Sequence, residues 1–204
     1  MILRNEFFSQ NTLLTAKRLL GKKICRKMPS RKMFEGIIVE TEAYQGENDL
    51  ACHASKGMTL KNKILYDRPG TMYVYFTYGM HYMFNIVTES EGCPTAVLVR
   101  AVMPVSGMEY MAQRRYNKKK ITEKELVNLA NGPAKFTRAF GINGKFNGKF
   151  LGNDIWIEDG IEGDFRITRD KRIGVEYAGK SKDWEYRFYI NKKPFINYVS
   201  KLKS

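Results

Sequence analysis

The sequence is poor in the features that mark several large protein classes. Its 204 residues include three cysteines, two histidines and two tryptophans, and there is no run of the roughly 18 apolar residues that a membrane-spanning helix needs. Cys25, Cys52 and Cys93 are odd in number and far apart, so they form no metal-binding pair and indicate no disulfide framework, which fits a reducing cytoplasm. The opening stretch MILRNEFFSQ lacks the apolar core of a cleavable signal peptide. We therefore expect a cytoplasmic protein without a membrane anchor.

Acidic residues are also scarce relative to basic ones. The chain has 35 Lys and Arg against 21 Asp and Glu, a formal net charge of +14. A positive potential over much of the surface attracts phosphate-rich partners and favours nucleic acid, although it also serves solubility alone. A membrane surface is less favoured, because no basic amphipathic helix with a wide apolar face stands out.

The chain is long enough for one substantial core, and we expect one domain over residues 1–204. Capping residues, periodicity and turn residues predict a mixed α+β fold with mainly antiparallel strands. The expected helices cover 11–21, 107–124 and a short stretch within 130–142. The expected strands cover 22–28, 33–44, 72–78, 82–87, 95–105 (ended by Pro104) and parts of 154–160, 165–177 and 185–190. Residues 45–67 are expected to form an irregular loop, long enough to indicate function.

The strand motif VETEAY (39–44) carries the first chemical signal. With a two-residue period its side chains divide into one face with Val39, Thr41 and Ala43 and another with Glu40, Glu42 and Tyr44. Two carboxylates and a phenol on one face of a strand that enters a core are unusual, because unpaired buried charge is costly.

Three interpretations of these acids remain open from the residues alone. Glu40, Glu42, Asp49 and His53 are a possible ligand set for a divalent metal, as in a phosphodiesterase. Alternatively, one Glu is a general base that deprotonates water in an aromatic pocket. The structural alternative is a salt bridge to Arg100, whose guanidinium in an apolar strand needs a carboxylate or phosphate partner.

The segment MYVYFTYGMHYMFNIV (72–87) predicts a hairpin with aromatic or sulfur side chains on both faces. Core packing accounts for many of them, but Tyr78 and Met80 fall at the expected turn, where large apolar groups gain little burial. On a basic protein an exposed aromatic tip indicates stacking on bases or a wedge between base pairs. If the turn has an odd number of residues, Tyr75 and Asn85 lie on the same face. A lone Asn in a strand is more often structural.

Taken in order and spacing, VETEAY, ACHASKG, RPGTMYVYFTYGMHYMFNI, VLVRAVMP and ANGPAKF resemble the alkyladenine DNA glycosylases, the 3-methyladenine glycosylases of the N-methylpurine type. The resemblance runs from FFSQ to YAGKSKDWEYRFYI and diverges in the loop 55–67 and in FNGKF. It implies a single compact α+β domain with a curved antiparallel sheet, flanking helices and a protruding hairpin. The iron–sulfur members of the helix-hairpin-helix glycosylases are excluded, because they need four cysteines.

The resemblance also implies roles for individual residues. Glu42 matches the general base that activates water, and Arg100 matches the arginine that helps hold the water and the backbone of the flipped nucleotide. Glu40 has no catalytic counterpart and is interpreted as structural. The pocket wall that sandwiches the extruded base is implied to comprise Tyr44, His53 and Tyr75.

Further residues are implied to contact DNA or to select the base. Tyr78 matches the side chain inserted into the duplex, with Met80 beside it at the hairpin tip. Asn85 matches the residue that crowds the exocyclic amino group of guanine, and Lys135 falls in a DNA-facing segment.

The implied activity is that of a monofunctional glycosylase on duplex DNA. It would remove 3-methyladenine, 7-methylguanine, hypoxanthine or ethenoadenine with a Glu-activated water and leave an abasic site in base excision repair. No metal or cofactor is expected, and no motif places a lysine as a Schiff-base nucleophile. We expect a monomer, cytoplasmic or, in a bacterium, associated with the nucleoid. The competing hypotheses are a metal-dependent nuclease and a non-enzymatic basic nucleic-acid-binding module.

Overall fold

The computed structural model describes residues 1–161 and 166–190. The strands are β1 (Lys23–Lys27), β2 (Met33–Gln45), β3 (Met72–Thr77), β4 (His81–Val87), β5 (Thr95–Ser106), β6 (Ile155–Glu158), β7 (Ile167–Asp170) and β8 (Arg187–Ile190). The α-helices are α1 (Asn5–Phe8), α2 (Thr12–Arg18), α3 (Met108–Tyr116), α4 (Glu123–Val127) and α5 (Pro133–Phe140). Short 3₁₀ helices cover Gly46–Asn48, Lys63–Tyr66, Gly144–Phe146 and Gly179–Asp183.

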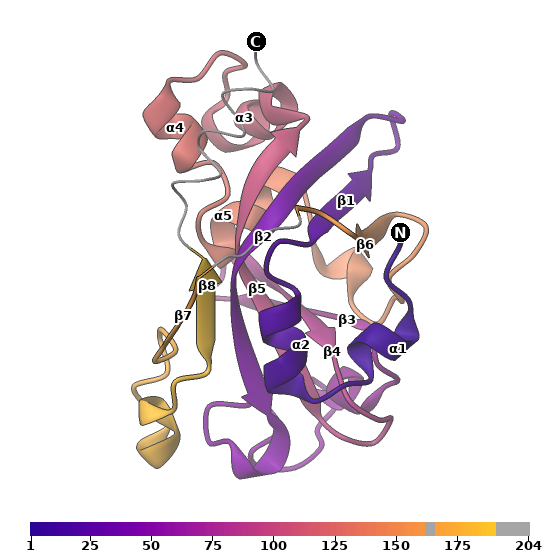
Figure 1. Ribbon diagram of the computed structural model, residues 1–204, viewed down its shortest axis with the longest axis vertical. Coiled ribbons are helices and arrows are strands. Elements are labelled where there is room, and N and C mark those ends of the chain that lie inside the picture. Colours follow the sequence, from indigo (N-terminus) through magenta and orange to yellow (C-terminus); the bar gives the residue numbers. More distant parts are fainter. Residues whose placement is uncertain (162–165, 191–204) are drawn as a thin grey trace.

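The strands form one antiparallel sheet in the order β3-β4-β5-β2-β1-β6, with β8 paired to β2 and β7 to β8. The long strands β2 and β5 run through the middle of the molecule, and the helices are distributed around them (Figure 1). The predicted α+β class with a curved antiparallel sheet is therefore confirmed.

Strand β2 organises the sheet because it has different partners along its length. One edge pairs with β5, and the other pairs first with β1 and then, at Glu40–Glu42, with β8. Bulges around Ile38–Thr41 shift the register against β5, which bends and twists a strand locally. The acidic motif thus lies where the sheet bends and where its last described strand joins it.

Helices α2 and α5 cover the sheet with apolar side chains. The Thr41 hydroxyl on β2 donates to the Ala16 carbonyl oxygen of α2, 2.9 Å away, and the Asn11 side chain caps that helix. Phe136 of α5 packs edge-on to Phe84 of β4, with ring centroids 5.9 Å apart. These contacts place the main core on the face of β2 that carries Thr41, opposite the face with the two glutamates.

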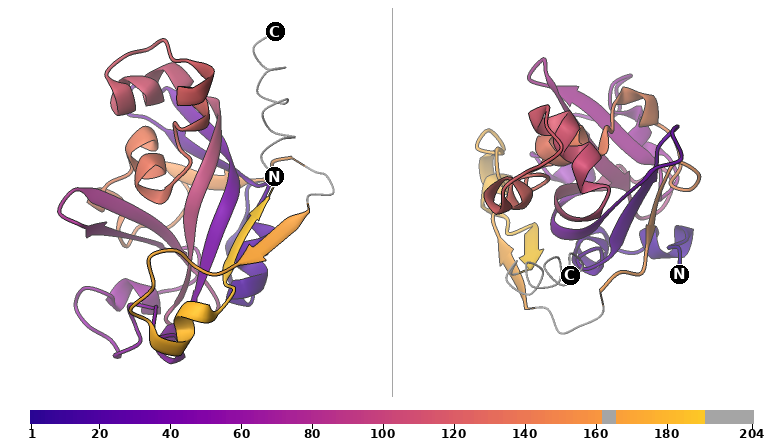
Figure 2. Two further views of the ribbon diagram at one scale, coloured as in Figure 1. Left: turned by 90° about the vertical axis from the view of Figure 1, so that its left-hand side faces the viewer. Right: turned by 90° about the horizontal axis from the view of Figure 1, so that it is seen from above.

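The β3–β4 hairpin projects from the body of the molecule (Figure 2). Thr77 pairs with His81, so three residues, Tyr78, Gly79 and Met80, form the turn. Tyr73 pairs with Asn85 and Tyr75 with Met83. The predicted hairpin is confirmed, and its three-residue turn meets the condition that places Tyr75 and Asn85 on one face.

Two predicted boundaries are wrong. Strand β5 continues through Pro104 to Ser106, because Pro104 lies opposite Gly36 beside a register shift, where a missing N–H is tolerated. A side chain at position 36 would bring its Cβ within 2.3 Å of the Val102 Cγ1, so this close approach of the strands requires glycine. The helix expected over 107–124 ends at Tyr116, because Asn117 adopts a left-handed φ of 57° and caps α3.

The segment 165–177, part of which is expected to be a strand, forms one over Ile167–Asp170; Phe165 lies outside the described residues. Residues 171–178 leave the sheet instead. Among the described residues, none of the helices has the length and apolar character needed to cross a membrane.

Candidate active site

The register of the sheet aligns five side chains across five strands. Tyr73 of β3 is opposite Asn85 of β4, Asn85 is opposite Leu98 of β5, Leu98 is opposite Glu42 of β2, and Glu42 is opposite Arg187 of β8. Residues directly opposite each other in an antiparallel sheet point to the same face. Side chains far apart in the sequence are therefore brought together on one surface.

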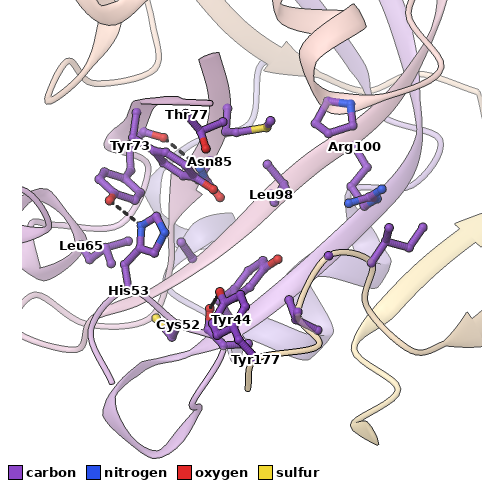
Figure 3. A pocket seen from close by; sticks show the side chains of 18 of the residues that line it. Tyr44, Cys52, His53, Leu65, Tyr73, Thr77, Asn85, Leu98, Arg100 and Tyr177 are labelled. Atoms are coloured by element: carbon purple, nitrogen blue, oxygen red, sulfur yellow. Dashed lines mark hydrogen bonds between the residues drawn. The ribbon is translucent and has the colours of Figure 1, made fainter. Parts of the chain in front are cut away.

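A cavity of about 410 Å³ opens over this surface. Its sides come from the loop after β2 (Ala51–His53), from the hairpin, and from residues 173–177. Figure 3 shows His53 and Tyr73 on one side of the cavity and Arg100 on the other. The predicted pocket residues that line it are Tyr44, His53, Tyr75, Asn85 and Arg100, and Tyr78 lies at the same cavity.

Aromatic rings form the wall on the hairpin side. The His53 ring is 4.5 Å from that of Tyr75, and its Nδ1 is 2.8 Å from the Tyr73 hydroxyl. Burial lowers the pKa of His53 below its ordinary value, so the imidazole is neutral at physiological pH. Burial likewise raises the pKa of Tyr75, which keeps its phenol protonated. The wall is therefore uncharged and aromatic, a surface suited to a planar ring.

Glu42 lies beneath the cavity and is fully buried. Its Oε2 accepts a hydrogen bond from the Tyr44 hydroxyl at 2.9 Å, its Oε1 accepts one from the Ile173 N–H at 2.8 Å, and Arg100 Nη1 is 3.2 Å from Oε1. Burial raises the pKa of Glu42 above its ordinary value, and Arg100, the Ile173 N–H and the Tyr44 hydroxyl offset part of that rise. All three donors belong to residues that line the cavity.

Arg100 bridges the two glutamates of VETEAY. Its Nε is 3.0 Å from Glu40 Oε1, while Nη1 faces Glu42. Burial alone would lower the pKa of Arg100, but Glu42 and Glu40 outweigh it and raise that pKa. Glu40 also contacts Arg187 Nη1 at 3.3 Å. The salt bridge considered as the structural alternative therefore exists, and Arg100 forms it with both Glu40 and Glu42.

The proposed metal ligands do not converge. Asp49 is fully buried against Arg172, and His53 contacts the Tyr73 hydroxyl. Within residues 1–161 and 166–190, no three His, Cys, Asp or Glu side chains are grouped as a metal site would need. The hypothesis of a four-ligand site from Glu40, Glu42, Asp49 and His53 is wrong, because a buried arginine occupies both oxygens of Asp49.

The hairpin tip is exposed, as the sequence predicted. Tyr78 and Met80 are 80% and 69% exposed. Tyr78 has a left-handed φ of 51°, which costs energy for a bulky residue. Lys135, in the first turn of α5, contacts Asn131 Oδ1 at 2.9 Å and does not line the cavity, although the neighbouring Pro133 does.

Sequence reasoning missed the contribution of residues 172–177. Ile173 supplies an N–H to Glu42, and Tyr177, which is 69% exposed, covers part of the cavity. The sequence RITRDKRIGVEY predicts a strand in this stretch, and a strand prediction gives no sign that residues 173–177 line a cavity. Gly174, which has a φ of 78°, was the available signal against a strand through this stretch.

Comparison with known proteins identifies relatives of this chain. The model of the methylpurine-DNA glycosylase family matches residues 6–194. The chain belongs to the methylpurine-DNA glycosylase family. This confirms the resemblance to the alkyladenine glycosylases, and membership makes the chain a DNA glycosylase for alkylated purines, a DNA-repair hydrolase of N-glycosyl bonds whose substrate is DNA.

Individual methylpurine-DNA glycosylase relatives match along almost the whole chain. One from Prosthecochloris aestuarii is 44% identical over 200 residues, covering 97% of this chain and 91% of its own length. One from Clostridium acetobutylicum is 40% identical, covering 98% of this chain and 100% of its own length. One from Desulfitobacterium hafniense is 38% identical, with coverages of 96% and 98%. Each is named, provisionally, as a 3-methyladenine DNA glycosylase.

Proposed function

We propose that this chain is a monofunctional glycosylase that extrudes a damaged purine from duplex DNA and hydrolyses its N-glycosidic bond with water activated by Glu42. The product is an abasic site in an intact strand, and the reaction uses neither metal nor cofactor. The observation that carries the proposal is one buried carboxylate held by three donors from the lining of an aromatic cavity.

The contacts of Glu42 support its role as the base. A carboxylate offers about four lone-pair positions; Tyr44 and Ile173 each fill one by a hydrogen bond, and Arg100 forms an ion pair with Oε1. In this proposal the attacking water binds a remaining lone pair of Oε2. Ionised Glu42 takes a proton from this water and also stabilises the positive charge that develops on the sugar as the glycosidic bond breaks. Arg100 holds the water and the backbone of the flipped nucleotide.

The cavity walls support selection of the base. An extruded purine stacks between Tyr44 on one side and His53 and Tyr75 on the other, and an electron-poor or cationic ring gains most from such walls. Asn85 is buried, and its amide donates to the Tyr73 carbonyl oxygen at 3.1 Å, which fixes its position. A fixed side chain there crowds the exocyclic amino group of guanine-type bases.

The leaving group decides how much help each lesion needs. 3-Methyladenine and 7-methylguanine are cationic and leave unaided, whereas hypoxanthine and ethenoadenine need protonation or strong hydrogen bonding as they depart. Tyr78 fills the gap that the flipped base leaves, with Met80 beside it, and Lys135 contacts the DNA backbone. One lesion needs one active site, so the proposed unit is a monomer with a single glycosylase domain over residues 1–204.

The substrate range is tested by release of free base from duplexes that carry each of the four lesions, assayed side by side in EDTA. We expect base release without strand cleavage. Strand cleavage that stops in EDTA, without release of free base, would support the metal-dependent nuclease, and strand nicking trapped covalently by borohydride would contradict a monofunctional enzyme.

The role of Glu42 is tested by Glu42→Gln, which keeps the size of the side chain and removes the base. We expect duplex binding to persist while base excision falls by several orders of magnitude, since no second carboxylate among the described residues has Glu42's position under the cavity. Glu40→Gln is the matched control, because it makes the same change two residues away on the same strand. Near-normal turnover of Glu42→Gln would remove Glu42 from this role.

A further inference from the structure

A second buried ion pair lies behind the cavity wall. Arg172 and Asp49 both have fully buried side chains. Arg172 Nη1 is 2.5 Å from Asp49 Oδ2, and Nη2 is 2.8 Å from Oδ1, a bidentate arrangement. The two residues are 123 positions apart in the sequence. Neither side chain lines the cavity, so neither is placed to contact a base.

The pair joins three chain segments that do line the cavity. Arg172 also donates to the Ala43 carbonyl oxygen at 2.9 Å, between Glu42 and Tyr44 on β2, and to the Ser181 carbonyl oxygen at 3.1 Å. Asp49 accepts hydrogen bonds from the N–H groups of Gln45 and Ala51 at 3.1 and 3.0 Å. The loop that leads to His53, the end of β2 and the segment 172–181 therefore meet at one point.

Arg172 is also linked to two of the three groups that contact Glu42. The Arg172 guanidinium lies 4.8 Å from the centre of the Tyr44 ring, and the Tyr44 hydroxyl donates to Glu42. The residue after Arg172 is Ile173, whose N–H donates to the other oxygen of Glu42. Two of the three donors to Glu42 are thus fixed by contacts with Arg172.

We propose that Arg172 and Asp49 are positioning residues for the reaction, setting the orientation of the Glu42 carboxylate through Ile173 and Tyr44. This rests on the proposed role of Glu42 as the base. A buried ion pair adds little net stability, because desolvation offsets its attraction. The four hydrogen bonds of the Arg172 guanidinium instead fix the positions of the segments around Glu42. Small displacements of a reacting group reduce rates by as much as about 10²-fold.

The test uses Arg172→Lys, Arg172→Met and Asp49→Asn in the full-length chain. The single-turnover rate of base release at saturating enzyme is measured beside the Kd for a duplex with a stable abasic-site analogue. We expect the rate to fall by roughly tenfold to 10²-fold, in the order parent, Lys, Met, while the Kd changes much less. Arg172→Lys should keep part of the rate, because lysine keeps the positive charge but cannot form the bidentate hydrogen bonds to Asp49.

Two controls separate positioning from folding. Lys171→Ala removes the exposed ion pair with Asp183 at the adjacent position and should leave the rate unchanged. Ile157→Ala removes a buried side chain on β6, an edge strand on the far side of β1, and so lowers stability without touching the site. Rates are normalised to the fraction of enzyme that binds the abasic-site duplex. If Arg172→Met does not fold, Arg172→Lys and Asp49→Asn carry the test.

The outcomes distinguish this inference from the proposed function. If Arg172→Lys and Asp49→Asn release base as fast as Ile157→Ala while Glu42→Gln is inactive, the positioning role is overturned and the function of Glu42 stands. If Glu42→Gln is itself active, the proposed function is overturned. A reduced rate with a nearly unchanged Kd supports the positioning role.

Discussion

At the scale of single residues, burial and the polar neighbours of Glu42 act on its pKa in opposite directions. Complete burial favours the neutral acid, whereas three donors, one of them the Arg100 guanidinium, favour the anion. Burial is the larger effect, so the pKa of Glu42 is raised from its ordinary 4.5. The anion that remains at neutral pH is poorly solvated, which makes it a stronger base than an exposed carboxylate.

This shift predicts the pH dependence of base release. If Glu42 is the base, as proposed, the anion is the active form, and the single-turnover rate should rise with pH through a pKa above 4.5 and level off beyond it. The measurement is the rate against pH for a cationic lesion, which needs no acid. Glu40→Gln should keep the rise, and the residual rate of Glu42→Gln should lack it. A flat profile down to pH 4.5 in the parent enzyme would contradict the shift.

The same shift has a consequence for stability, with a definite sign. A carboxyl with a raised folded-state pKa contributes stability that is complete below its unfolded pKa and is lost as pH rises through the folded pKa. The stability of Glu42→Gln relative to the parent should therefore increase above pH 4.5. Urea unfolding of both proteins at several pH values gives the difference in their free energies of unfolding. The contributions of the other titrating groups are the same in both proteins and cancel in this difference.

At the scale of elements, the hairpin was the most predictable feature and residues 171–178 the least. Alternation and a glycine turn define β3 and β4 locally, so the exposed tip followed from the sequence. The contact between Arg172 and Asp49 joins residues 123 positions apart, and no local pattern encodes such a pairing. The same limit applies to Pro104, whose tolerance within β5 depends on Gly36 of another strand.

The hairpin tip predicts a difference between duplex and single-stranded DNA. Tyr78→Ala removes a ring that is 80% exposed, so folding should be unaffected, but the stacking that replaces the extruded base, worth about 1–3 kcal/mol, is lost. Binding to a lesion-containing duplex should therefore weaken more than binding to the same lesion in a single strand. Met80→Ala is the neighbouring control for general loss of apolar surface. Equal losses on both DNA forms would argue against a wedge.

At the scale of the whole molecule, the net charge of +14 and the position of the cavity serve different steps. In the proposed function, charge contributes affinity for the phosphate backbone, whereas the cavity and Glu42 contribute the chemistry. Composition alone predicted the first. The position of the cavity could not be predicted in this way. It depends on the spatial order of the strands, which places β4, β5, β2 and β8 side by side although this is not their order along the chain.

Because surface charge and the cavity are assigned to different steps, salt should affect DNA affinity and the rate of base release differently. Affinity for undamaged duplex should fall steeply with salt, on the order of 10²-fold between about 50 and 200 mM, because counterions are released on binding. The single-turnover rate at saturating enzyme should change little over the same range, since the buried contacts of Glu42 are poorly screened. Fluorescence anisotropy and rapid quench measure the two quantities. Salt-independent binding would contradict a phosphate-driven interface.

Strand β8 joins β2 at Glu40–Glu42, although more than a hundred residues separate the two strands in the chain. During synthesis, the N-terminal strands emerge from the ribosome long before Ile173 and Arg187 are available to complete the surroundings of Glu42. Such distant pairings form late. Under the proposed function, a nascent or prematurely terminated polypeptide ending before residue 170 would carry the hairpin proposed to enter DNA without a complete hydrolytic centre, and unfinished copies would not release bases.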